Sequence, residues 1–117
     1  MTTTGIATLD HAPQVFAEWL NELSDDLGFP KPRAYVLLHE TLHAIRDFLP
    51  VDEAADLAAQ LPVLVRGVYF EGWNPSKTPA KRRNKSDLIE RASSRFQKEP
   101  LDDPDRAVAA VIDLLRR

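Results

Sequence analysis

The stretch PVLVRGVYFEGW, residues 62–73, decides between an all-helical fold and a mixed one. Its valines and aromatic residues would suit a β-strand, but a lone strand would have no neighbour and its backbone hydrogen bonds would go unmade. The apolar residues in and just before the stretch instead share one helical face: Leu57, Leu61, Leu64, Val65 and Val68. We therefore predict a helix here. Gly67 inside it costs about 1 kcal/mol relative to alanine, which suggests that another backbone packs closely there.

Apolar residues at spacings of three and four predict helices on both sides of this stretch. Asp10, Asp52 and Asp103 are placed to cap helices, as is either Asn84 or Ser86. Gly28 is placed to end the first one. The fold class that follows is an all-α bundle of five or six short antiparallel helices. The helices expected are about 10–28, 33–49, 52–61, 62–72, 84–96 and 103–117.

A single domain, residues 1–117, is expected to contain two related halves. A shift of 73 residues pairs Arg33 with Arg106 and Leu38 with Val111 without a gap, although apolar spacing alone leaves true duplication open. The second half has no counterpart of the helix at 52–61, so we expect it to leave an apolar groove open. The segments expected are a frayed N-terminus at 1–9, a first helical unit at 10–72, a loop at 73–85 and a truncated second unit at 86–117.

Composition narrows the classes of function. The chain has 117 residues, a formal net charge of −3 and no cysteine. The charge gives no global basic field for nucleic acid or anionic lipid. The lack of cysteine excludes disulfide frameworks, thiolate metal sites and cysteine nucleophiles, and it suits a reducing cytoplasm. No apolar run approaches the length of a membrane span, and the first residues do not have the pattern of a secretion signal.

Three stretches resemble a known bacterial family, the one called domain of unknown function 2267. They are HAIRDFLPVDEAADLAAQLP, RGVYFEGWNPSKTP and, more loosely, DPDRAVAAVIDLLRR. The resemblance implies an all-helical, apparently duplicated domain with no established activity and no catalytic residues to carry over. Members usually continue past the last helix into another AQLP-like segment. This chain lacks that segment, so either the natural protein is short or the chain has been cut.

HETLH, residues 39–43, matches the H-E-x-x-H pattern of zinc peptidases. Zinc catalysis also needs a third protein ligand, an open coordination position and a cleft. Glu53, Asp56 or Glu71 could supply a carboxylate, but no pattern marks one of them. His39 and His43 fall at the margin of the helix's apolar face, where imidazoles commonly pack their rings. We therefore expect a structural role and no metal or other cofactor, and keep a metal-dependent hydrolase as the third alternative.

Two other groups of residues could bind a partner. Arg66, Tyr69, Glu71 and Trp73 are of the types that dominate protein–protein hot spots, although aromatic residues near a turn more commonly hold a loop against the bundle. Basic residues next to aromatic ones could bind nucleic acid or phosphate, although one basic loop on an acidic protein is commonly a solvated turn. This basic patch comprises Lys77, Lys81, Arg82, Arg83 and Lys85.

Taken together, the residues favour a non-catalytic cytoplasmic helical interaction module, with a protein partner or a second copy of the chain as its ligand. The alternative is a domain associated with nucleic acid or phosphate through the loop at 77–85. No hydroxyl nucleophile has a recognisable base beside it, so we expect no enzyme activity.

Overall fold

The computed structural model describes residues 3–81 and 84–116. Within these ranges the fold is all-α, with no strand, which confirms the predicted class. The stretch at 62–73 contains a helix, as predicted, at Val63–Phe70. The elements are α1 (Ala7–Asp10), α2 (Ala12–Leu27), α3 (Lys31–Phe48), α4 (Val51–Ala59), α5 (Val63–Phe70), the 3-10 helix η1 (Pro75–Lys77), α6 (Lys85–Ala92) and α7 (Pro104–Leu115).

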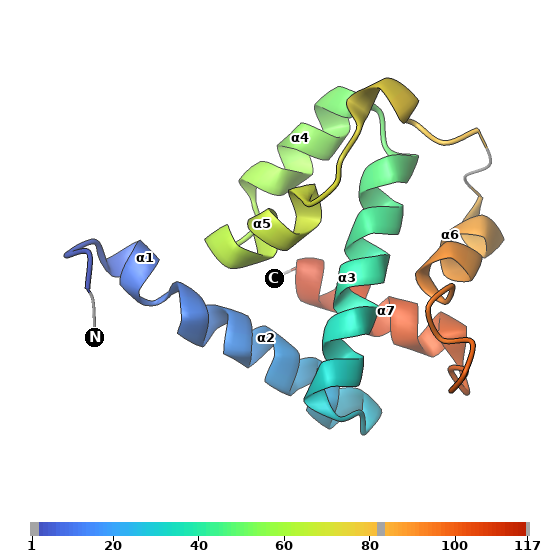
Figure 1. Ribbon diagram of the computed structural model, residues 1–117, viewed down its shortest axis with the longest axis horizontal. Coiled ribbons are helices and arrows are strands. Elements are labelled where there is room, and N and C mark those ends of the chain that lie inside the picture. Colours follow the sequence, from blue (N-terminus) through green and yellow to red (C-terminus); the bar gives the residue numbers. More distant parts are fainter. Residues whose placement is uncertain (1–2, 82–83, 117) are drawn as a thin grey trace.

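Helix α3 is the centre of the bundle and packs against α2, α5, α6 and α7. In Figure 1, α4 and α5 lie on one side of α3 and α6 on the other, while α7 crosses it. Four-residue spacing puts the buried side chains of α3 on one stripe facing these neighbours. The stripe includes Ala34, Leu38 and Leu42, none of which is exposed to solvent.

A glycine and two polar caps set three helix ends where the sequence predicted them. Gly28 ends α2 in the left-handed conformation, at φ 69°, which costs glycine least. Asn84 accepts a hydrogen bond from the backbone of Asp87 in a capping box, and Asp103 caps α7.

The predicted start of the chain was wrong. The segment expected to fray contains α1, and Asp10 lies in that helix instead of capping the next one. Its carboxylate accepts hydrogen bonds from the backbone and hydroxyl of Thr4, and these lower its pKa. Two other differences are smaller. Asp52 lies inside the first turn of α4, whose cap position is Pro50. Helix α6 ends at Ala92, before the buried Phe96.

The apolar groove expected over the second unit is filled. Helix α7 packs against both α2 and α3, and its buried residues include Val108, Val111 and Leu114. The large apolar side chains that are exposed lie elsewhere in the described part of the chain: Ile6, Leu9, Val51 and Leu64. None of the helices between residues 3 and 116, as far as they are described, has the length and hydropathy to cross a bilayer.

Candidate functional site

Two of the predicted partner-binding residues have structural roles. Tyr69 is 0% exposed and donates its hydroxyl hydrogen bond to the carbonyl oxygen of Ala54 in α4, 2.8 Å away. The guanidinium of Arg66 donates to the carbonyls of Ala58 and Leu61, both at 2.9 Å, where α4 ends. Ala58 lies in the last turn of α4 and Leu61 just beyond it, so the guanidinium of Arg66 covers the C-terminal end of that helix. Tyr69 offers no surface to a partner.

The other two predicted residues follow α5. Trp73 is half-buried and its ring lies 5.2 Å from that of Phe70. Its Nε1 is buried without a hydrogen-bond partner among the described residues. The carboxylate of Glu71 is exposed, and Oε1 lies 3.7 Å from Nε2 of His39. The ring of Trp73 therefore packs against the end of α5, whereas the carboxylate of Glu71 lies beside His39 of α3.

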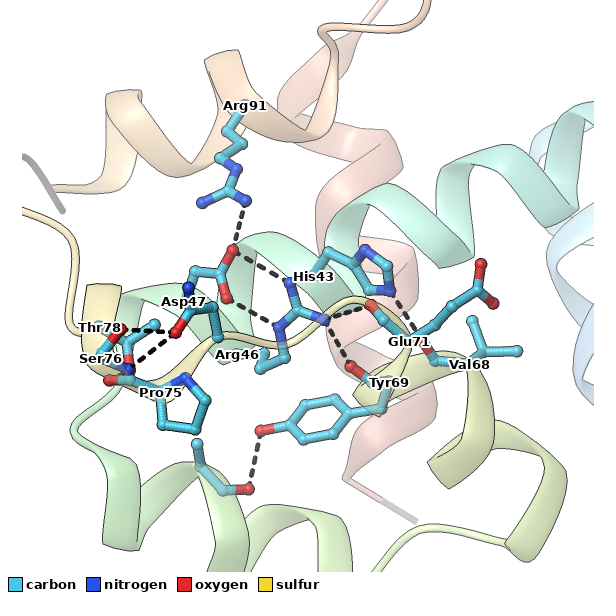
Figure 2. Close-up of polar contacts among 12 residues, drawn as sticks. His43, Arg46, Asp47, Val68, Tyr69, Glu71, Pro75, Ser76, Thr78 and Arg91 are labelled. Atoms are coloured by element: carbon cyan, nitrogen blue, oxygen red, sulfur yellow. Dashed lines mark hydrogen bonds and ion pairs between the residues drawn. The ribbon is translucent and has the colours of Figure 1, made fainter.

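A buried charge network joins α3 to α5 and α6 (Figure 2), and the sequence analysis missed it. Arg46 is 4% exposed and donates to the carbonyl oxygens of Tyr69 and Glu71, at 3.0 and 2.8 Å. It also forms two hydrogen bonds with the carboxylate of Asp47, which pairs with Arg91 as well. Arg46 continues the stripe of Leu38 and Leu42 at four-residue spacing, and that position was the available signal for its burial.

Opposing effects act on the pKa of Asp47. Burial alone would raise it, but the hydrogen bonds and positive charges of Arg46 and Arg91 outweigh burial and hold the pKa below its ordinary value. The carboxylate therefore remains ionised in the fold. The network uses its polar groups on one another and on backbone carbonyls, so it acts as a clamp between helices.

The two histidines of HETLH lie half-buried on α3, at the margin of its apolar stripe. Their ring centroids are 4.1 Å apart. Nδ1 of His39 lies 2.6 Å from Oε2 of Glu40, and Nε2 of His43 lies 2.7 Å from the carbonyl oxygen of Val68 in α5. Burial is the main cause that lowers the pKa of His43, so its imidazole is neutral at pH 7. One possible ligand atom each from His39, Glu40 and His43 lie within 4.8 Å of one another.

An apolar hollow adjoins these histidines. It is lined by Phe16, Tyr35, Leu64 and Val68, from α2, α3 and α5. The ring of Tyr35 lies 6.0 Å from that of His39, so the hollow and the histidines belong to one face of the molecule. Leu64 at its edge is 42% exposed.

The basic patch is only partly within the described residues. Lys77, Lys81 and Lys85 are exposed, whereas Arg82 and Arg83 lie outside the described residues. Asp87 and Glu90 line the same hollow as Lys81, so acidic side chains lie among the basic ones. Binding of nucleic acid or phosphate by this loop stays a prediction.

Comparison with known proteins gives a family but no activity. The family described as "Uncharacterized conserved protein (DUF2267)" matches residues 16–117. No curated protein matches the chain.

Proposed function

Since the chain belongs to the DUF2267 family of uncharacterised conserved proteins, we propose from its own surface that it is a non-catalytic helical module of the cytoplasm that associates with a second copy of itself. The absence of cysteine from the sequence suits that reducing compartment. The polar side chains that fix α5 to α3 and α4 to α5 are committed to structural hydrogen bonds, notably those of Arg46, Arg66 and Tyr69. The remaining feature of the surface that could bind a partner is the set of exposed apolar side chains on α1 and α5.

One observation carries this proposal: the apolar side chains on α1 and α5 are uncovered. Helix α1 has four residues and buries none of them, while Ile6 and Leu9 are 55% and 44% exposed. An isolated helix of this length is unstable in water. In Figure 1 it lies at the outer end of α2, away from α6 and α7. A partner that covers it would supply the apolar burial that α1 lacks, at roughly 25 cal/mol per Å².

The apolar hollow extends the same argument to α5. Leu64 borders it, and Phe16, Val68 and Tyr35 line its wall. Apolar and aromatic side chains of this kind form the centres of homodimer interfaces. A symmetric dimer would use the same surface on both copies, so substitution of one residue removes two contacts.

The mass of the protein in solution tests the proposal. We expect light scattering to give the mass of two chains at micromolar concentrations. Leu64→Asp places a charge at the interface and should give the mass of one chain. Val51→Asp is the matched control, because Val51 is 41% exposed but does not line the hollow, and it should remain dimeric. A wild-type mass of one chain throughout this range would contradict self-association.

A further inference from the structure

We propose that a hollow between the start of α3 and the segment after α6, the cationic hollow, binds a small amphipathic carboxylate with an apolar body and one anionic end. This inference is independent of self-association and goes beyond it. The hollow has a volume of about 410 Å³, which lies within the range of small-molecule sites. Its apolar lining comprises Pro30, Pro32, Val36 and Phe96.

The cationic hollow lies at a place where the two halves of the chain differ. Helix α2 has 16 residues, whereas α6, which starts 73 residues later, has eight and ends at Ala92. The segment at 93–100 is not helical, although it contains arginine, glutamine, lysine and glutamate, which favour helix. Pro100 stands where α2 has Leu27, and a proline disfavours helical backbone at the residue before it. Conflicts between local propensity and observed conformation are expected at functional sites.

Contacts from α3 hold this non-helical segment, the loop between α6 and α7 in Figure 1, in place. Arg33 donates hydrogen bonds to the carbonyl oxygens of Glu99 and Pro100, at 2.9 and 3.2 Å. Its guanidinium also lies 4.9 Å from the ring centroid of Phe96, a residue that is 6% exposed. The apolar wall is therefore formed before any ligand arrives, which lowers the entropy that binding must cost.

The cations of the hollow stand where the first half of the chain has acidic residues. Arg95 and Lys98 line the hollow and are exposed. The residues 73 positions earlier are Glu22 and Asp25. The guanidinium of Arg95 lies 3.8 Å from Oε2 of Glu40, too far for a short hydrogen bond, so its N–H groups can bind a ligand. Two such cations beside an apolar wall complement a carboxylate with an apolar body.

Glu99 limits the charge of the ligand. It also lines the hollow, and its side chain is 86% exposed. Its carboxylate repels an anion and partly offsets the two cations. A ligand with a single negative charge is therefore favoured over a multiply charged phosphate.

Titration of ¹⁵N-labelled protein with sodium octanoate, followed by NMR, tests the site. We expect saturable shifts of the amides of Val36, Phe96 and Lys98. Sodium acetate has the charge without the apolar body, and 1-octanol has the apolar body without the charge, so both should bind more weakly. Inorganic phosphate should not produce these shifts. The absence of saturable shifts, or shifts centred on Leu64 and Val68 in the hollow beside α5, would overturn the proposal.

A pair of double variants tests the role of the two cations, and circular dichroism checks that each variant is folded. Arg95→Gln/Lys98→Gln should weaken octanoate binding by roughly 5–10-fold, because two exposed ion pairs are lost. Lys77→Gln/Lys85→Gln is the matched control, because it makes the same change in net charge at exposed positions that do not line the hollow. It should bind octanoate as the wild type does. Equal losses in both double variants would show a general effect of charge and contradict the site.

Glu99→Gln gives a test with the opposite sign. The two hydrogen bonds that Arg33 donates to this segment go to backbone carbonyls, so the substitution should leave the fold intact. It removes the negative charge beside the bound carboxylate, and octanoate should therefore bind more tightly. Weaker binding in Glu99→Gln would contradict the placement of the carboxylate in this hollow.

Discussion

Arg33 and Arg106, which are 73 residues apart, make equivalent ion pairs between the two halves of the chain. Arg33 reaches forward to Glu99, and Arg106 reaches back to Asp26. The two acidic partners are also 73 residues apart, as are the starts of α2 and α6 and those of α3 and α7. This reciprocity is what a duplicated unit packed about a pseudo-two-fold axis would produce. The spacing of apolar residues alone could not have distinguished a duplicated unit from a chance repeat.

Although the two arginines are equivalent in position, we expect them to contribute unequally to the free energy of unfolding. Arg33 donates to the carbonyls of Glu99 and Pro100, and its guanidinium lies 4.9 Å from the ring centroids of both Phe29 and Phe96. We expect Arg33→Leu to lower the free energy of unfolding by about 2 kcal/mol. The half-exposed guanidinium of Arg106 pairs with the carboxylate of Asp26, so Arg106→Leu should lower the free energy of unfolding less. Urea unfolding followed by circular dichroism measures both, and equal losses would contradict this ranking.

The lowered pKa of Asp47 predicts a dependence of stability on acid. A carboxyl whose pKa is lower in the folded state stabilises the fold at pH values above its unfolded pKa, and that contribution is lost as pH falls through the folded value. We expect Asp47→Asn to cost about 2 kcal/mol at pH 7. The difference from wild type should shrink below about pH 4. Urea midpoints at a series of pH values check this, and a gap that stays constant down to pH 2 would be inconsistent with the linkage.

Tyr69 predicts the opposite behaviour in alkali. Burial is the main cause that raises its pKa to about 12. Because the pKa is raised in the folded state, the contribution of Tyr69 to the stability of the fold is complete below the ordinary tyrosine pKa of about 10. It is lost as pH rises through about 12. Tyr69→Phe should remove one late step from the tyrosinate absorbance titration. It should also cost about 1 kcal/mol at neutral pH, because the hydrogen bond to Ala54 is lost. A titration curve unchanged by the substitution would contradict the assignment.

Helix ends were predictable because their signals are local. Gly28, Asn84 and Asp103 act on the backbone within a few residues of themselves. The short α1 was not predictable, since four residues have no periodicity to detect. Phe96 fitted the apolar spacing of the preceding helix, yet it is buried from a turn beyond the end of α6. Tertiary packing can bury an apolar side chain such as that of Phe96 even where its backbone is not helical.

Only part of the candidate site could be predicted from the sequence. His39 and His43 are four residues apart, so their meeting on one helix face follows from helical geometry. Glu71 was one of several carboxylates that could have joined them. Its proximity depends on α5 ending beside α3, where Arg46 binds the carbonyl of Glu71 at 2.8 Å. Such a contact across 25 residues comes from packing, which spacing does not specify.

Gly67 gives a prediction of increased stability. The sequence suggested close packing against another backbone, and this expectation was wrong. Gly67 is exposed within α5, and a Cβ atom added to it would meet nothing within 4 Å. The glycine therefore has an entropic cost without a packing benefit, so Gly67→Ala should raise the free energy of unfolding by about 0.5–1 kcal/mol.

Gly28 is the matched control for this substitution. Its surroundings are equally open, but its φ of 69° lies in the left-handed region, where a Cβ atom costs roughly 1–2 kcal/mol. Gly28→Ala should therefore destabilise the protein while Gly67→Ala stabilises it. Thermal unfolding of both variants measures the two signs in one experiment. If Gly67→Ala were destabilising, that glycine would have to serve a contact beyond the single chain, and the surface of α5 near Leu64 would be the place to look for it.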